Sequence, residues 1–244
     1  MNKAEIDLVN DMNSKRPINI YLAGDSTVAN CPPNEAPMAG WGQVFQSFFT
    51  EEVIVHNHAK GGASTNSFIA EGRLRPILES IQPDDYLFIQ FGHNDQKPYG
   101  TEPYTTYKAY LTEYIMGARK KGAIPILLTS VHRRNFDQNE VLVNTLGDYP
   151  QSMLELAKKL EVQLIDLSAK TAQLYQSLGV EGSKQLFTWF NAHEHPNFPS
   201  GIQDNTHFCE AGAREVAKLV IEGIKELQLP IRSFIKKLEK ESRR

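Results

Sequence analysis

The chain has 244 residues, 41% of them hydrophobic, which is enough for a sizeable core and excludes a protein that is disordered throughout. Its 26 basic and 29 acidic residues give a net charge of −3, which argues against nucleic acid as a partner. No apolar run approaches the roughly 20 residues that span a bilayer, so we also expect no membrane partner.

Short apolar runs predict the strands of one sheet. They cover residues 18–23, 53–57, 86–91, 124–129 and 162–167. These runs are rich in β-branched residues and almost continuously apolar, as is typical of strands buried on both faces of a parallel sheet. Because helical patterns lie between them, we predict a three-layer α/β fold with a five-stranded parallel sheet.

The helical patterns are amphipathic or carry capping residues. Apolar residues recur at helical spacing over 41–48 and over 216–224. Pro150 suits the first turn of a helix that runs to about residue 160, and Ser168 and Gly179 mark the start and end of another.

A last amphipathic helix is predicted over residues 231–244, packed on the domain or on a partner. No linker rich in Pro or Gly divides the chain, so we expect one domain over 1–244 with a core of about 18–226. The sequence does not determine the oligomeric state.

Residues that can take part in catalysis follow the predicted strands. Ser26, Gly62 and Asn94 come after the first, second and third strands, and Asp204 and His207 precede the last long helix. In an open parallel sheet, ligands bind beyond the carboxyl ends of the strands. One edge of the sheet therefore collects a nucleophile, a base with an acidic partner, and donors for an oxyanion.

Each of these residues has an assignable role in acyl transfer. The Ser26 hydroxyl needs a base, which His207 supplies, and Asp204 would fix the tautomer of that histidine. The amides of Ser26 and Gly62 and the Asn94 side chain would bind the oxyanion. Taken singly, these residues are more simply explained as caps, turns and a surface histidine, and only the combination indicates catalysis. Asp25 is expected to be structural.

Four blocks of the sequence carry a family resemblance. They are Ala23-Gly24-Asp25-Ser26-Thr27, residues 57–64 around Gly61-Gly62, Gly92-His93-Asn94-Asp95, and Asp204-Asn205-Thr206-His207-Phe208. Together they resemble the blocks of SGNH, or GDSL-type, hydrolases. Ser64, Phe68, Glu71-Gly72-Arg73, residues 131–136 and Asp148-Tyr149-Pro150 are similar to the rhamnogalacturonan acetylesterase branch of that family.

The resemblance implies a flavodoxin-like fold over about residues 18–224 and ester hydrolysis by Ser26, His207 and Asp204, without metal or other cofactor. It implies an oxyanion hole formed by Ser26, Gly62 and Asn94, and a small acetylated pectin-type oligosaccharide as substrate. Many relatives are secreted, whereas residues 1–16 are acidic and lack an apolar signal region. We therefore expect a cytoplasmic enzyme that acts on imported oligosaccharides.

Further residues are candidates for substrate contact. Trp189 lies in an aromatic segment that either stacks on sugar faces or packs as a loop. Arg133 and Arg134 either bind galacturonate carboxylates or face solvent. Cys31 and Cys209 are expected to be unreactive thiols.

Other functions remain open at this stage. His193 and His195, with Asp204 and His207, are an alternative set of metal ligands, although Ser26 and Asn94 would then have no task. Within enzymes, the alternatives are a general esterase or lipase of the same family and a xylan acetylesterase. Outside enzymes, the alternative is a carbohydrate-binding protein that keeps the fold without turnover.

Overall fold

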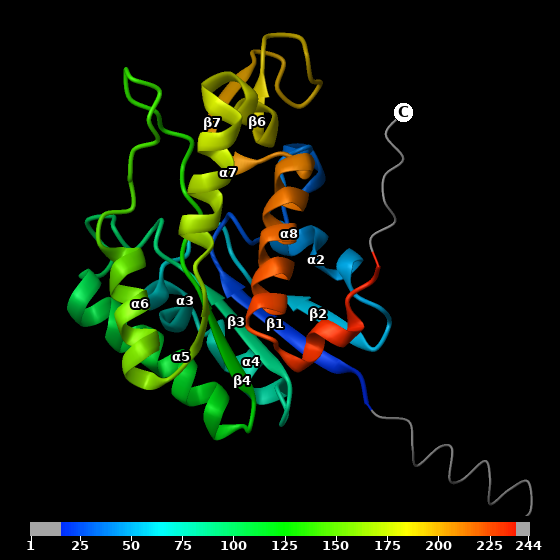
Figure 1. The fold of residues 1–244 in the computed structure, drawn as a ribbon, viewed down its shortest axis with the longest axis vertical. Helices are drawn as coiled ribbons and strands as arrows, with labels where there is room; N and C mark the ends of the chain where they lie inside the picture. Colours follow the sequence, from blue (N-terminus) through cyan, green and yellow to red (C-terminus); the bar gives the residue numbers. More distant parts are fainter. Residues whose placement is uncertain (1–15, 238–244) are drawn as a thin grey trace, which may run out of the picture.

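The computed structural model describes residues 16–237, and its centre is a parallel sheet (Figure 1). The strands are β1 (Ile18–Gly24), β2 (Val53–Asn57), β3 (Tyr86–Gln90), β4 (Ile124–Leu128) and β5 (Gln163–Ile165). They form a five-stranded sheet in the order β2-β1-β3-β4-β5, with every neighbouring pair parallel. The predicted fold class is therefore confirmed. Only β5 is clearly shorter than expected, because Asp166 already caps the next helix.

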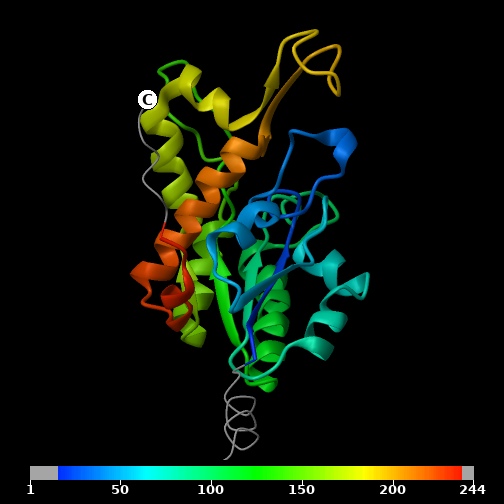
Figure 2. The ribbon, with the colours of Figure 1, turned by 90° about the vertical axis from the view of Figure 1, so that its right-hand side faces the viewer.

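Helices cover both faces of this sheet (Figure 2). They are α2 (Trp41–Phe45), α3 (Thr65–Ala70), α4 (Leu74–Ser80), α5 (Lys108–Lys120), α6 (Tyr149–Leu160), α7 (Leu167–Gly182) and α8 (Glu210–Glu226). Alternate residues of β1 enter the two cores: Ile20 and Leu22 pack with α2, α7 and α8, whereas Tyr21 and Ala23 pack with α3 to α6. The near-continuous apolar pattern of the strands follows from burial on both faces.

A second sheet lies beyond the main one and was not predicted. Strands β6 (Phe187–Phe190) and β7 (Ile202–Phe208) pair antiparallel, with Phe187 opposite Phe208. Figure 1 shows them above the N-terminal end of α8, away from the five-stranded sheet. We call residues 187–208 the β6–β7 ribbon. The polar run at 203–207 carries no alternating apolar pattern, so a sequence pattern does not identify β7 as a strand.

The predicted C-terminal helix is wrong over its described part. Residues Pro230–Phe234 form a 3₁₀ helix, and Ile235 then forms an antiparallel bridge with Phe49. The amides of Thr50 and Lys236 donate to the carbonyls of Phe234 and Phe48, so pairing with another segment replaces helical hydrogen bonds. Residues 238–244 of that prediction lie outside the described residues.

Two other helices depart from expectation. Helix α7 begins at Leu167 with Asp166 as its N-cap, so Ser168 lies inside the helix. It also continues to Gly182 through a kink at Gly179, whose φ is +69°. Helix α2 ends at Phe45 and is followed by a 3₁₀ turn. Helix α6, in contrast, has Pro150 in its first turn and ends at Leu160, as predicted.

Over residues 16–237, none of the helices combines the length and the apolar character that crossing a membrane requires.

Candidate active site

Ser26 lies on the turn that follows β1, and a buried network of hydrogen bonds fixes this turn. Asp25 Oδ1 accepts from the Thr27 amide at 2.9 Å and from Thr27 Oγ1 at 2.8 Å. Thr27 Oγ1 in turn accepts from Gln90 Nε2 at 2.7 Å, and Gln90 Oε1 accepts from Trp41 Nε1 at 2.8 Å. These side chains are all buried, so the network holds the turn against β3 and α2. Asp25 thus lies in the structural position expected for it.

His207 reaches the turn from the β6–β7 ribbon. Its Nδ1 lies 2.7 Å from Asp204 Oδ2, and its Nε2 lies 2.9 Å from Ser26 Oγ. Asp204 Oδ1 accepts from the amides of Thr206 and His207, which orients the carboxylate within the same strand. Because Nδ1 donates to Asp204, Nε2 is left to accept the Ser26 proton. The structure therefore brings together the three residues that the sequence indicates.

Asp204 and His207 stabilise the charged form of each other. Burial opposes ionisation of Asp204, but the hydrogen bonds from His207 and from two amides outweigh it and lower the pKa of the carboxyl. The hydrogen bond to Asp204 raises the pKa of His207 above its ordinary value of 6.5, although burial opposes the shift. A carboxylate partner thus strengthens His207 as a base, as proton transfer from a serine requires.

Donors for an oxyanion face the same cavity. The backbone amides of Ser26 and Gly62 donate to no acceptor of residues 16–237. Asn94 Nδ2 donates one hydrogen to the Ala63 carbonyl at 2.9 Å, which fixes the amide and leaves its second hydrogen available. Gly62 has a φ of +78°, a conformation that favours glycine. The three expected donors therefore surround one space.

That space is an open cavity of about 720 Å³ at the carboxyl edge of the sheet. Ser26, His207, Gly62 and Asn94 line it, as do the charged side chains of Glu35, Lys97 and Arg133. The remaining lining residues are Ala29, Asn30, Cys31, Pro32, Met38, Gly61, His93, Asp204 and Thr206. A cavity of this size accommodates a small organic molecule beside the Ser26 hydroxyl.

Comparison with known proteins agrees with this geometry. Residues 22–215 match the model of the GDSL-like lipase/acylhydrolase family. The chain belongs to that family. It is 62% identical over 221 residues to rhamnogalacturonan acetylesterase RhgT of Bacillus subtilis, a match that covers 91% of this chain and 95% of the relative. It is 28% identical to a rhamnogalacturonan acetylesterase of Emericella nidulans, over 73% of this chain and 78% of that one.

Solved structures share the fold of this chain. Protein YxiM of Bacillus subtilis superimposes with a TM-score of 0.76 and 30% identity, over 88% of this chain and 58% of that chain. The acetylxylan esterase Axe2 of Geobacillus stearothermophilus gives a TM-score of 0.61 at 16% identity, over 86% of this chain and 94% of its own, and shows the fold alone. As an acylhydrolase-family chain, the protein is an ester hydrolase, and the resemblance seen in its sequence is confirmed.

Two predicted substrate contacts lie away from the cavity of this acylhydrolase. Arg134 is 6% exposed and donates to Asn205 Oδ1 at 2.8 Å, to Ser183 Oγ and to the Val180 carbonyl. Trp189 donates to the same Asn205 oxygen at 3.0 Å, and its ring lies against the Arg134 guanidinium. Neither side chain lines the cavity. Instead, they anchor the β6–β7 ribbon, so the solvent-facing alternative is also wrong for Arg134.

The two additional histidines of the alternative metal site also lie away from the cavity. His195 packs against Phe190 and Phe198, and neither His193 nor His195 lines the cavity. Within residues 16–237, no three His, Cys, Asp or Glu side chains are arranged to hold a metal ion.

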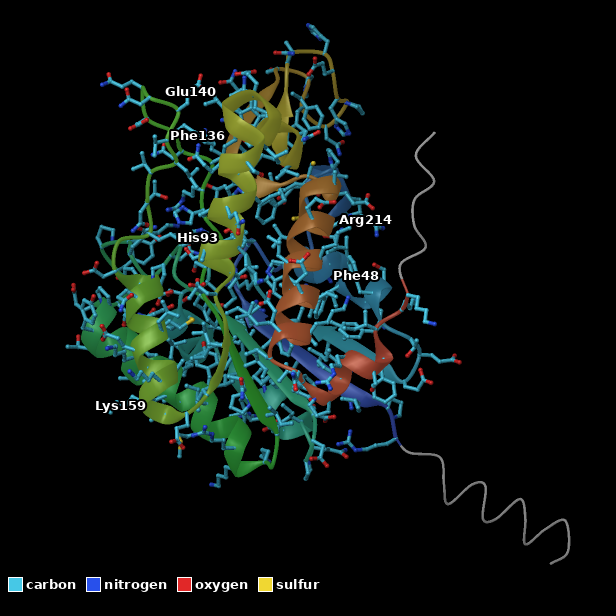
Figure 3. All side chains as sticks on the ribbon, viewed as in Figure 1. Phe48, His93, Phe136, Glu140, Lys159 and Arg214 are labelled. Carbon is cyan, nitrogen blue, oxygen red and sulfur yellow. The ribbon has the colours of Figure 1, made fainter. Side chains whose placement is uncertain are left out.

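Sequence reasoning missed a buried pair behind Ser26. His93 Nε2 donates to the Val131 carbonyl at 2.9 Å, and its Nδ1 lies 3.5 Å from Asp25 Oδ2. Neither of these two facing atoms has a hydrogen-bond partner among the described residues. Figure 3 shows His93 between the sheet and the loop that carries Phe136. The pair links the turn of Ser26 to the segment of Asn94. In the sequence, the position of His93 directly before Asn94 was the one indication of this pair.

Proposed function

We propose that this acylhydrolase removes acetyl groups from rhamnogalacturonan-type oligosaccharides through an acetyl-enzyme on Ser26. The observation that carries the mechanism is the continuous series of hydrogen bonds from Asp204 through His207 to Ser26 Oγ, all three residues lining an open cavity. The catalytic residues in this proposal are Ser26, His207 and Asp204, with Ser26, Gly62 and Asn94 as the oxyanion hole.

The reaction then proceeds in two halves. Ser26 Oγ attacks the acetyl carbonyl while His207 Nε2 takes its proton, and the oxyanion accepts from the Ser26 and Gly62 amides and Asn94 Nδ2. His207 returns the proton to the sugar oxygen, the carbon–oxygen bond breaks, and the deacetylated sugar leaves. Water gives a proton to His207 Nε2 and attacks the acetyl carbonyl of the acetyl-enzyme. The bond between Ser26 Oγ and the acetyl carbon then breaks, His207 returns the proton to Oγ, and acetate departs.

The substrate assignment is supported by the relatives. The name of the 62% identical relative, rhamnogalacturonan acetylesterase, applies to an alignment that covers almost the whole of both chains. An open cavity suits an acetyl group on a sugar, whose remaining hydroxyls need polar surroundings. The likeness to an acetylxylan esterase is one of fold, so it does not favour xylan as the substrate. Of the predicted sugar contacts, we retain Arg133, which lines the cavity.

A cytoplasmic location is part of the proposal. Both cysteines are free, and Cys31 lines the cavity, a state that a reducing compartment maintains. Fractionation of the producing cells tests this point, and recovery of the protein mainly from the culture medium would overturn it.

The deciding experiment measures acetate release from acetylated rhamnogalacturonan oligosaccharides, acetylated xylo-oligosaccharides and an aryl acetate. We expect the highest kcat/KM on the first substrate. A preference for xylan would retain the mechanism and reject the substrate. Covalent labelling of Ser26 by an organophosphonate separates a working hydrolase from a carbohydrate-binding protein of the same fold.

A further inference from the structure

Two buried side chains behind Ser26 face each other without a hydrogen bond. Asp25 Oδ2 lies 3.5 Å from His93 Nδ1, and the two side chains are 0% and 4% exposed. Neither atom has a hydrogen-bond partner within residues 16–237. Because a buried polar atom without a partner costs free energy, this arrangement needs a physical reason.

The second ring nitrogen of His93 indicates where the protons lie. Nε2 is 2.9 Å from the Val131 carbonyl, and a carbonyl oxygen only accepts, so Nε2 carries a proton. A neutral imidazole would then direct the lone pair of Nδ1 at the Asp25 carboxylate, which is repulsive where water is excluded. A second proton, on Nδ1, turns the same contact into an ion pair, and 3.5 Å is within the range of ion pairs.

Asp25 is the negative partner of this pair. Its Oδ1 accepts from the amide of Thr27 at 2.9 Å and from the Thr27 hydroxyl at 2.8 Å. Burial opposes ionisation of Asp25, but the contacts with His93 and Thr27 outweigh it and lower the pKa of the carboxyl. The proton between the two side chains therefore belongs on His93.

The two side chains come from the two segments that carry Ser26 and Asn94. Asp25 directly precedes Ser26 after β1, and His93 directly precedes Asn94. Gly24 and Gln90 are the last paired residues of β1 and β3, so both segments have left the sheet where the pair forms. An ion pair at this point links the turn of the nucleophile to the segment of an oxyanion donor.

The charge of Asp25 also acts on His207. The hydrogen bond to Asp204 is the largest influence that raises the pKa of His207, and the negative charge of Asp25 adds to it. His207 becomes positive as it takes the Ser26 proton, so a fixed negative charge nearby stabilises the transition state. The other ionisable groups whose charges act on Asp25 or His93, or are acted on by them, are Asp95, Tyr107, His132 and Arg133.

We infer that Asp25 and His93 form a buried ion pair that holds Ser26 and Asn94 in their relative positions and favours protonation of His207 during catalysis. Both are positioning residues, because they act through Ser26, Asn94 and His207. The inference is independent of the sugar that is deacetylated, but it rests on the roles proposed for those three residues.

Asp25→Asn tests the negative partner. The variant keeps the size of the side chain and an acceptor for Thr27, but it removes the charge. With an aryl acetate as substrate, we expect kcat to fall about tenfold while KM changes little, because substrate binding does not use the pair. The midpoint of activity against pH should move to lower pH, since His207 loses a nearby negative charge.

His93→Gln tests the positive partner. The glutamine amide nitrogen replaces Nε2 and keeps a donor for Val131, but Asp25 loses its cation. We again expect kcat to fall about tenfold with little change in KM. In the double variant the two losses should not multiply, because each single substitution already removes the same contact.

NMR spectroscopy of ¹⁵N-labelled protein reports the proton itself. At neutral pH the His93 ring, assigned through its backbone, should carry a proton on each nitrogen in the wild type. In Asp25→Asn it should carry one proton, on Nε2, because the asparagine amide can donate to Nδ1. The wild-type spectrum decides the protonation state even where a variant folds poorly.

Asp85→Asn is the matched control. Asp85 is as buried as Asp25 and also has a basic partner, Arg16, but it directly precedes β3, at the opposite edge of the sheet from Asn94. Its side chain accepts from the amides of Asn19 and Gln82. This variant should lower Tm and leave kcat and the pH midpoint unchanged.

The inference and the proposed function fail separately. If Asp25→Asn and His93→Gln lower only Tm, as the control does, the pair is merely structural and the inference is overturned, even where acetate is released from rhamnogalacturonan oligosaccharides. A wild-type His93 with a single ring proton overturns the ion pair as well. Losses of kcat together with the shifted midpoint, without acetate release from those oligosaccharides, support the inference and overturn the proposed substrate.

Discussion

The two halves of the candidate active site are anchored in different ways. Ser26 lies on a turn joined to β3 and α2 by the buried hydrogen bonds of Thr27, Gln90 and Trp41. His207 lies on β7, outside the five-stranded sheet, in a ribbon held by the packing of Phe187 against Tyr175 of α7 and by Arg134. The 2.9 Å contact between Ser26 and His207 is where these two independently held parts meet. Substitutions can therefore change the position of the nucleophile and that of the base separately. We call the turn with Ser26 and the segment with Asn94 the sheet-borne half, and the ribbon with His207 and Asp204 the ribbon-borne half.

Ser26→Ala removes the nucleophile from the sheet-borne half and has the largest expected effect. Because Oγ is half-buried and makes one side-chain hydrogen bond, we expect the fold to persist while kcat falls by roughly 10⁵-fold or more. Acetate release and thermal unfolding, measured side by side, check this. Turnover near that of the wild type would mean that Ser26 is not the nucleophile.

Asp204→Asn disturbs the ribbon-borne half without moving the backbone. We expect kcat to fall on the order of 10⁴-fold, because the imidazole loses the partner that sets its tautomer. The wild-type activity should rise with pH as His207 loses its proton, with a midpoint above 6.5. In the variant the hydrogen bond that raises this pKa is gone, so the midpoint should move to lower pH. Rate profiles against pH measure both effects, and an unshifted midpoint would contradict the pairing.

Asn94→Ala removes one oxyanion donor from the sheet-borne half. A loss of about 10²- to 10³-fold in kcat is expected, with a small change in KM, because this contact strengthens only in the transition state. Steady-state kinetics on an aryl acetate separates the two constants. A loss confined to KM would assign Asn94 to substrate binding instead.

Arg134→Gln and Gln90→Leu sharpen the comparison between the two anchors. Arg134 bonds to the ribbon through Asn205, so its loss should let His207 drift and lower kcat about tenfold, the effect of roughly 1.4 kcal/mol. Gln90→Leu leaves the donor of Trp41 unpaired in the core, so the free energy of unfolding should fall by about 1–3 kcal/mol.

Activity and urea unfolding of both variants test this division. If Arg134→Gln costs stability but leaves kcat intact, the ribbon is positioned by other contacts. If Gln90→Leu lowers kcat more than Arg134→Gln does, the sheet-borne half is the more easily disturbed of the two.

The sequence by itself determined the parallel sheet and the identity of the residues at its edge. Buried parallel strands leave a near-continuous apolar pattern, and residues such as Ser26 and Asn94 follow those strands directly. Local pattern failed where packing between distant segments decides the conformation. Residues 234–236 pair with residues 48–50, and β7 is a strand because it pairs with β6.

Only the tertiary structure decided the roles of the two neighbouring arginines. In the chain Arg133 and Arg134 are equivalent, but the segment that carries them makes a tight turn, in which the Asn135 amide donates to the Arg133 carbonyl, and the two side chains separate. One guanidinium therefore lines the cavity and the other is buried beneath the ribbon. The distance of 2.9 Å between Ser26 and His207, 181 residues apart, is likewise a property of how the sheet and the ribbon pack, which no local pattern encodes.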